Sequence, residues 1–293
     1  MSALIGIDWG TSNLRAFRFA AAGDVAERRA SPRGITTVRD GGFEAVLCDI
    51  VGDWIASDTR IVMAGMIGSR GGWVEAPYLP CPADPAALAA ALIRVPTALA
   101  PCFIVPGLSS GPDQPADVMR GEETQIAGAG VADGLIALPG THGKWARLEA
   151  GRVVAFRTAM TGELFRLLVD HSLLGRLIKA DASPDEGDAF ARGVRRSVAE
   201  PSLAATLFSA RAEVLLGRMA PAEITAYLSG LLIGAEVATL AHEGEPVTLV
   251  GDPALTGRYH KALTLAGAGP IDLIDGETAA AAGIWQIAKD ARP

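Results

Sequence analysis

Two short turns rich in glycine, threonine and serine carry the residues of this chain best suited to chemistry on phosphates. Each follows an apolar run, and their sequences are Asp8-Trp9-Gly10-Thr11-Ser12 and Pro139-Gly140-Thr141-His142-Gly143-Lys144. Backbone N–H groups and hydroxyls of such a turn can cup phosphate oxygens, and Asp8 can hold a hydrated Mg²⁺ that neutralises them. Arg15 can add positive charge. An aspartate before a single turn is more often an ordinary turn cap, but two such turns facing each other would clamp the phosphates of a nucleotide.

The second turn is not a P-loop. That motif would need a glycine at position 138 and a serine or threonine at position 145, where the chain has Leu138 and Trp145. No G-x-G-x-x-G motif follows a predicted strand either, so a Rossmann dehydrogenase is unsupported. Of the four histidines, only His142 lies inside a turn of this kind and is a candidate functional residue.

Two adjacent glutamates and two arginines could complete the chemistry of phosphoryl transfer. An attacking hydroxyl must lose its proton, and Glu122 and Glu123 in the segment MRGEETQ are the best carboxylates to accept it. A simpler interpretation, in which they only stabilise the dipole of a first helical turn, is at least as good on sequence alone. Arg120 and Arg70 could each pair a substrate carboxylate through two N–H groups, or be solvated surface residues. The glycines after Arg70, beginning with Gly71, favour binding because they allow a ligand close to the backbone.

The elements that position these residues repeat along the chain. Strands are predicted at 3–8, 14–19 and 25–30, followed by a helix with an apolar stripe at 43–55. The same order of strand, Gly-Thr turn, strand, strand and helix returns from residue 135 to residue 179. A helix at 118–131 closes the first half. This repeat predicts two domains, 1–131 and 132–293, and we expect the last helix, about 277–289, to pack back at the hinge.

The composition is that of a folded protein with an acidic balance. The 293 residues include 26 basic and 33 acidic side chains, a net charge of −7, and no basic run. This balance argues against nucleic acid or an anionic membrane as a partner. The apolar stretch Tyr227–Ala241 contains Glu236 and is shorter than the roughly 20 residues of a membrane span. Three cysteines without metal-type spacing indicate free thiols in a cytoplasmic protein. The sequence leaves the oligomeric state open, a homo-oligomer included.

Taken together, the motifs resemble those of a known superfamily. GIDWGTSNLRAF is similar to the first phosphate motif of the acetate and sugar kinase, Hsp70 and actin superfamily, LPGTHGKWA to the second, and VTLVGDPAL to the adenosine motif. The resemblance implies an α/β, two-domain actin-like (ribonuclease H-like) ATPase fold with a duplicated mixed-sheet core and an interdomain cleft. It implies ATP and Mg²⁺ as cofactors, with Asp8 coordinating the metal through water. The N-terminal domain would hold the substrate and the first phosphate hairpin, and the C-terminal domain would bind ATP.

The combination of GIDWGTSNLR, MIGSRGGW, MRGEETQI, LPGTHGKW and TAMTGELF resembles the 2-dehydro-3-deoxygalactonokinase family more closely. That resemblance implies transfer of the γ-phosphoryl group of ATP to the 6-hydroxyl of 2-dehydro-3-deoxy-D-galactonate, in galactonate breakdown. In related sugar kinases a Gly-Asp-Gln triplet supplies the base, and Gly121-Glu122-Glu123 matches it here, with the choice between the glutamates open. Arg70 matches a substrate-binding arginine, and Gly71 replaces the acidic residue that follows it there, which fits a substrate with its own carboxylate.

The remaining candidate residues lie within or beside these motifs. The predicted nucleotide-binding residues are Gly10, Thr11, Ser12, Arg15, Gly140, Thr141, His142, Gly143, Lys144 and Gly251. The predicted substrate-binding residues are Trp9, Arg70, Gly71 and Arg120. Two alternatives remain: a kinase of another sugar or sugar acid in the same superfamily, or a non-enzymatic nucleotide switch like actin or Hsp70. The stereochemistry of the sugar acid and the residues that contact adenine are not determined by the sequence.

Overall fold

The computed structural model describes residues 3–177 and 188–291, and the chain forms two compact units. Unit 1 comprises Met1–Asp133, Ala146–Phe156 and Asp275–Pro293, and unit 2 comprises Gly134–Trp145 and Arg157–Ile274. This division differs from the predicted boundary at 131/132. The first break falls two residues later, and two segments assigned by sequence to the C-terminal domain belong to unit 1. A linear cut could not anticipate this, because later segments of the chain return to pack on earlier ones.

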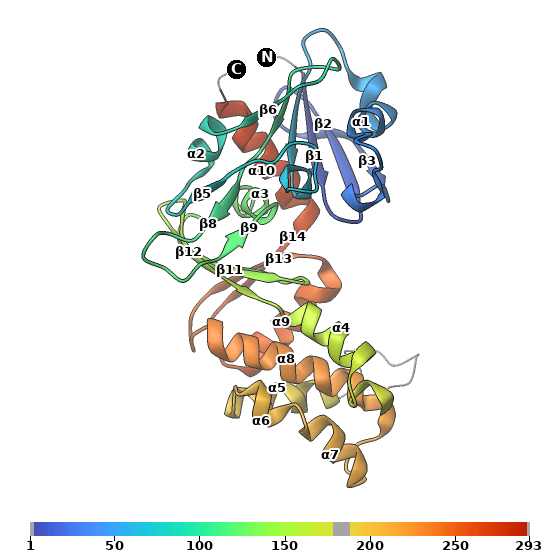
Figure 1. Cartoon of the computed structure of the whole chain (residues 1–293). Helices are drawn as coiled ribbons and strands as arrows, with labels where there is room; N and C mark the ends of the chain where they lie inside the picture. The colour runs from blue at the N-terminus through green and yellow to red at the C-terminus, as the bar shows by residue number, and fades with distance from the viewer. Residues whose placement is uncertain (1–2, 178–187, 292–293) are drawn as a thin grey trace. The chain divides into compact units, whose positions relative to one another are not determined.

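The main sheet of unit 1 has six strands in the order β3-β2-β1-β4-β7-β6 (Figure 1). The central strand β1 is antiparallel to β2, with Asp8 opposite Arg15, and parallel to β4, with Asp8 opposite Ala64. The sheet is therefore mixed, and β1 is buried because it has a neighbour on each side. The strands are β1 (Leu4–Trp9), β2 (Leu14–Phe19), β3 (Val25–Ser31), β4 (Arg60–Ala64), β6 (Ile93–Val95) and β7 (Cys102–Ile104). A smaller sheet contains β5 (Tyr78–Pro80), β8 (Gly107–Ser109) and β9 (Val118–Met119).

The second main sheet has five strands in the order β12-β11-β10-β13-β14. They are β10 (Gly134–Leu138), β11 (Gly143–Glu149), β12 (Arg152–Ala159), β13 (Val247–Gly251) and β14 (Ile271–Asp275). The link between β11 and β12 is Ala150-Gly151, both with positive φ (50° and 75°), as a two-residue hairpin turn requires. Strand β10 is parallel to β13, as β1 is parallel to β4. The order β3-β2-β1-β4 therefore recurs as β12-β11-β10-β13, which confirms the predicted duplicated mixed-sheet core.

One helix of unit 1, α3 (Glu122–Gly128), begins with the two glutamates predicted as candidates for the base. The other helices of this unit are α1 (Phe43–Val51), α2 (Pro85–Ala90) and α10 (Gly276–Asp290). The predicted helix 118–131 is wrong at both ends: residues 118–119 form β9, Gly121 adopts φ +104° before α3 begins, and α3 ends at Gly128. Helix α10 crosses α3 closely, since a Cβ at Gly283 would overlap the carbonyl oxygen of Thr124.

The helices of unit 2 surround a long buried helix. They are α4 (Thr161–His171), α5 (Ala189–Ala199), α6 (Leu203–Thr206), α7 (Ser209–Leu215), α8 (Ile224–Leu240) and α9 (Pro253–Leu265), and α5 lies alongside α8 (Figure 1). The predicted helix 161–179 is too long, because α4 ends at His171 and Ser172 has an extended backbone; residues 178–179 lie outside the described residues. One helical segment, Pro221–Leu240, is long and apolar enough to cross a membrane, but 78% of its apolar window is buried within the protein. Its apolarity is that of a core helix.

Candidate active site

The first Gly-Thr turn is held rigidly between β1 and β2. The carbonyl oxygens of Gly10, Thr11 and Ser12 accept hydrogen bonds from backbone amides of residues 34–36. The N–H group of Gly10 donates to the carbonyl of Asn13 at 2.8 Å. This amide is therefore already paired within the turn, whereas the sequence predicted that it would bind a phosphate. Thr11 and Ser12 are exposed, and their backbone N–H groups meet no acceptor in the described part of the chain. These two residues, rather than Gly10, present donors to a ligand.

Asp8 is the penultimate residue of β1 and lies beside a cluster of charges. The guanidinium of Arg15 bridges two carboxylates, with Nη1 at 3.2 Å from Asp8 Oδ2 and Nε at 3.3 Å from Glu277 Oε2. Burial raises the pKa of Asp8, Arg15 lowers it, and the negative charges of Glu277 and Glu122 raise it further. A raised pKa means that the charged form of Asp8 is disfavoured, and a cation near this carboxylate would stabilise that charged form. Glu277, in the first turn of α10, was not found by sequence reasoning, because only the fold brings it to Arg15.

No group of three or more potential metal-ligating side chains occurs among the residues that the structure describes. Mg²⁺ retains most of its waters and is usually held by one or two carboxylates together with substrate phosphates. Asp8 is partly exposed, with 22% of its side chain accessible. A single carboxylate of this kind is a suitable partner for a hydrated ion.

The two adjacent glutamates have different surroundings. Glu123 is 1% exposed, and its Oε2 accepts a 2.6 Å hydrogen bond from the backbone N–H of Gly121. Burial raises the pKa of Glu123 to about 8, with a smaller contribution from the neighbouring charge of Glu122. Glu122 is partly exposed, accepts a 3.0 Å hydrogen bond from the backbone N–H of Arg120, and is close enough to Asp8 to raise its pKa. Position and accessibility therefore favour Glu122 as the base.

The guanidinium of Arg120 is fixed in position and has N–H groups without an acceptor among the described residues. Its Nη2 donates to the carbonyl of Ala76 at 2.7 Å, and its guanidinium carbon lies 4.4 Å from the centre of the Tyr78 ring. Its Nε and Nη1 are buried and meet no acceptor among the described residues. Arg70 differs: 91% of its side chain is exposed, and it lies 3.7 Å from Glu75. A fixed guanidinium with unsatisfied donors is the stronger carboxylate-binding candidate.

Trp9 does not bind substrate, contrary to the sequence prediction. Its ring is fully buried, packs edge-on against Phe43 at 5.7 Å between centroids, and donates through Nε1 to the carbonyl of Arg33. Alternation along β1 places Asp8 and Trp9 on opposite faces of the sheet. The face that carries Trp9 is the core face, so this tryptophan stabilises the strand that carries Asp8.

The second Gly-Thr turn is braced by the first turn of α4. The backbone N–H of Glu163 donates to the carbonyl of Thr141, and the carboxylate of Glu163 pairs with Nε2 of His142. Arg166 donates to the hydroxyl of Thr141 at 2.9 Å. Gly140 is partly exposed, and Thr141 and His142 are exposed, so these residues of the predicted set are accessible.

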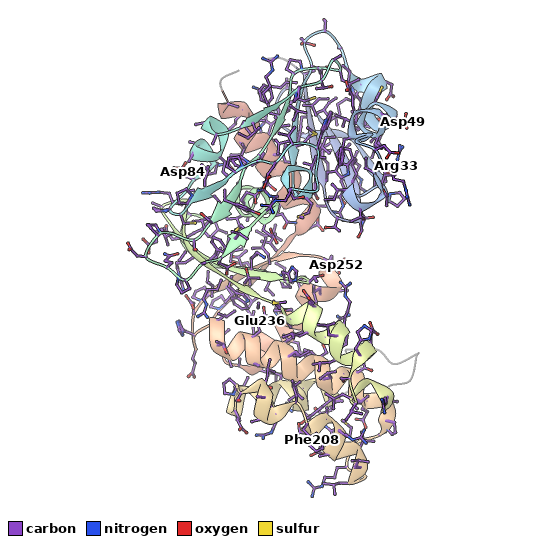
Figure 2. The ribbon with its side chains drawn as sticks, viewed as in Figure 1. Arg33, Asp49, Asp84, Phe208, Glu236 and Asp252 are labelled. Atoms are coloured by element: carbon purple, nitrogen blue, oxygen red, sulfur yellow. The ribbon has the colours of Figure 1, made fainter. Side chains whose placement is uncertain are left out.

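Lys144 and Gly143 face the interior, contrary to their predicted contact with nucleotide. Lys144 is 5% exposed, and its Nζ donates to the carbonyl of His142 at 3.0 Å, which closes the turn on itself. Gly143 is buried next to the carboxyl of Glu236. That carboxyl accepts hydrogen bonds from Trp145 Nε1 (2.7 Å) and Tyr259 Oη (2.6 Å), and burial raises its pKa (Figure 2). Gly143 and Lys144 therefore do not face a nucleotide, contrary to the sequence-based prediction; they stabilise the turn from inside the protein.

A cavity of about 430 Å³ adjoins the second turn within unit 2. It is lined by residues of the turn, α4, α8 and α9: Gly140, Thr141, Thr161, Gly162, Phe165, Arg166, Ser229, Leu232, Ile233, Leu255, Arg258 and Tyr259. Gly251, the predicted adenosine residue, ends β13 outside this lining, and the adjacent Asp252 caps α9 (Figure 2). Sequence reasoning missed most of these residues. The motif LPGTHGKW marked Gly140 and Thr141, TAMTGELF marked the start of α4, and VTLVGDPAL ended at Leu255, but no motif included Arg166 or Arg258.

The duplicated mixed sheet, with a Gly-Thr turn after the first strand of each copy, defines an actin-like ATPase fold. Component A of the (R)-2-hydroxyglutaryl-CoA dehydratase of Acidaminococcus fermentans shares this fold, with a TM-score of 0.51, 11% identity and complete coverage of both chains. Residues 8–287 match the 2-keto-3-deoxy-galactonokinase family, and the chain belongs to that family.

Two relatives agree with this assignment over nearly their whole length. The 2-dehydro-3-deoxygalactonokinase of Escherichia coli (strain K12) is 41% identical, with 97% of each chain covered. A crystal structure from Sinorhizobium meliloti, of a protein described as a 2-dehydro-3-deoxygalactonokinase, has a TM-score of 0.91 and 36% identity, with 99% of each chain covered. The resemblance found in the sequence motifs is thereby confirmed.

Proposed function

We propose that this protein is an ATP-dependent sugar-acid kinase that phosphorylates the 6-hydroxyl of 2-dehydro-3-deoxy-D-galactonate, in the cytoplasm, as a step of galactonate breakdown. Membership of the family, matched over residues 8–287, supports the reaction class. The observation that carries the proposal is the arrangement at the start of α3. There, an accessible Glu122 lies near Asp8, and Arg120 offers unsatisfied N–H donors.

Each of the two turns is proposed to offer hydrogen-bond donors to the phosphates of the nucleotide. Thr11 and Ser12 of unit 1 offer hydroxyls and backbone N–H groups to phosphate oxygens, as do Gly140 and Thr141 of unit 2. The cavity of about 430 Å³ beside the second turn lies within the volume range of small-molecule sites and is proposed as the nucleoside pocket. Arg166, which lines it and contacts Thr141, would supply positive charge near the phosphates.

Mg²⁺ is proposed to be held by Asp8 through water. The carboxylate is accessible over 22% of the side chain, and a nearby cation would offset the partial burial and the negative charges of Glu277 and Glu122 that raise its pKa. When bound, the ion would neutralise charge on the phosphates of ATP. Arg15 would hold the orientation of Asp8, because it is anchored on the other side by Glu277.

Glu122 is proposed to accept the proton of the 6-hydroxyl as that oxygen attacks the γ-phosphorus and ADP leaves. Arg120, with Arg70 from the exposed loop, would bind the carboxylate of the sugar acid and so place the hydroxyl. Positioning and charge stabilisation are the main sources of rate enhancement in phosphoryl transfer, while a general base contributes about 10²–10⁴-fold.

An ADP-release assay with 2-dehydro-3-deoxy-galactonate, its gluconate epimer and neutral hexoses tests the proposal. We expect the galactonate derivative to give the highest kcat/KM and the neutral sugars to give little turnover. Glu122→Gln should lower kcat by about 10²–10⁴-fold, while Glu123→Gln retains most of it. Preference for a neutral sugar would contradict the substrate assignment, and a fully active Glu122→Gln variant would contradict the assignment of the base.

A further inference from the structure

A second cavity lies in unit 1, apart from the residues proposed to bind substrates. Its volume is about 400 Å³, and its walls come from α2, α3, the β11–β12 turn and α10. The wall residues include Asp84, Leu88, Glu123, Ala127, Leu148 and Gln286. Asp84, at the start of α2, is labelled in Figure 2. Asp8, Arg70, Arg120 and Glu122 are not among the described residues that line it. A cavity of this volume is large enough for a small molecule.

The chemistry of the cavity is set by one buried acid among apolar walls. Glu123 is 1% exposed, its Oε1 meets no hydrogen-bond donor in the described part of the chain, and no salt bridge is found for it there. Leu88, Leu108 and Val153 supply aliphatic surface to the cavity wall, which also holds the polar side chains of Asp84 and Gln286. A buried carboxyl oxygen that accepts no hydrogen bond is energetically unfavourable. A ligand with a positive, hydrogen-bond-donating head group and an apolar body would complement both features.

We propose that this cavity is an effector site for a small organic ammonium ion, whose head group pairs with Glu123 and whose apolar body contacts the aliphatic wall. The overall negative charge of the protein, −7, favours entry of a cation. The proposed site is separate from the nucleotide and sugar-acid sites, so its occupant regulates the enzyme rather than reacting in it.

Glu123 connects the cavity to the proposed base. Its Oε2 accepts the backbone N–H of Gly121, and the hydroxyl of Thr124 donates to the carbonyl of the same glycine at 2.5 Å. Gly121 precedes Glu122 and adopts φ +104°, a conformation that must be held by its neighbours. A bound ammonium ion would favour the ionised form of Glu123, whose proton passes to solvent, and would draw the carboxylate toward the cavity. This movement would weaken the bond to Gly121 and disturb Glu122. Occupancy is therefore expected to lower turnover, a consequence that rests on the proposed function.

Benzylamine and the uncharged benzyl alcohol are matched probes for this site. Binding to the full chain is measured by calorimetry, and inhibition is measured by ADP release. Ala86→Trp places a large side chain at an exposed position of α2 that lines the cavity, and Ala87→Trp places it at the adjacent exposed position outside the lining. We expect benzylamine to bind the wild type and Ala87→Trp equally, and to bind Ala86→Trp at least about tenfold more weakly. Benzyl alcohol should bind the wild type about tenfold more weakly than benzylamine, because a charge-assisted hydrogen bond is lost.

The kinetic expectation is a lower kcat with the KM values for ATP and the sugar acid unchanged. Glu123→Gln should reduce the affinity for benzylamine to that for benzyl alcohol. The proposal is overturned if benzylamine does not bind, if Ala86→Trp binds it as well as the wild type, or if the alcohol binds equally well. Competition with the sugar acid would also overturn it, by placing the probe in the substrate site. Calorimetry needs no turnover, so a failure of the proposed kinase activity would be seen separately from a failure of this site.

Discussion

Replacement of Glu123 by glutamine should change how the stability of the protein depends on pH. The carboxyl has a pKa of about 8 in the folded protein, raised from 4.5 mainly by burial. Glutamine has nearly the same shape and can still accept the hydrogen bond from Gly121, but it cannot ionise. The variant therefore removes the titration while it retains the packing.

The sign follows from proton binding in the folded and unfolded states. Below pH 4.5 both states hold the proton, so the wild type has the full stabilising contribution. Between pH 4.5 and 8 the unfolded chain releases the proton and the folded protein retains it, so the free energy of unfolding falls as pH rises. The two pKa values differ by 3.5, and each unit corresponds to about 1.4 kcal/mol, which gives a total loss of about 5 kcal/mol. Above pH 8 both states are ionised and the loss is complete.

Urea unfolding at several pH values between 5 and 9 measures this effect. The free energy of unfolding of the wild type, relative to Glu123→Gln, should fall by about 1.4 kcal/mol per pH unit up to pH 8 and then level off. Glu149→Gln, which changes an exposed glutamate near the β11–β12 turn, is the control for loss of a carboxyl as such. If the wild type and Glu123→Gln show parallel pH curves, then Glu123 is not a buried titrating acid in the folded protein.

Three further predictions concern the α3–α10 crossing, tested with a control substitution, the guanidinium of Arg120 and the carboxylate of Asp8. Gly283→Ala should lower the free energy of unfolding by about 1–3 kcal/mol in chemical denaturation, because its Cβ would overlap Thr124. Gly257→Ala, at an exposed site in α9 with open space around it, should instead be neutral or stabilise by up to about 1 kcal/mol; equal losses would contradict the close α3–α10 crossing. Arg120→Lys should raise the KM for the sugar acid about tenfold or more, since one ammonium replaces a planar fork of donors; an unchanged KM would place the carboxylate elsewhere. Asp8→Asn should weaken Mg²⁺-dependent binding of ADP in calorimetry and lower kcat by at least about 10²-fold; normal turnover would refute the metal assignment.

The duplicated core could be predicted because its signals are local. Apolar strands, Gly-Thr turns and the hairpins after them are each encoded within a few residues, and their repetition near residues 3 and 135 is visible in the sequence. The structure confirms the repeat in the strand orders β3-β2-β1-β4 and β12-β11-β10-β13. The extent of each unit was not predictable in the same way, because β11, β12 and α10 are assigned by packing rather than by their order along the chain.

Motif membership was a weaker guide to the role of an individual side chain. Trp9 and Lys144 lie within the phosphate motifs, yet both are buried and stabilise the turns from inside. Conversely, Arg166 and Glu277 contact motif residues from helices that the motifs do not include. A spacing pattern reports which residues are near in sequence, but adjacent residues of a strand point to opposite faces of the sheet.

The sequence by itself determined the class of fold, the two phosphate turns and the family, because these depend on short segments with characteristic residue types. Only the tertiary structure distinguished Glu122 from Glu123, adjacent residues of the same chemical type. One is accessible beside Asp8, and the other is enclosed by apolar walls with a pKa near 8. The reason is physical: solvation and neighbouring charges determine what a carboxyl can do, and both are set by residues distant in sequence that folding brings around it.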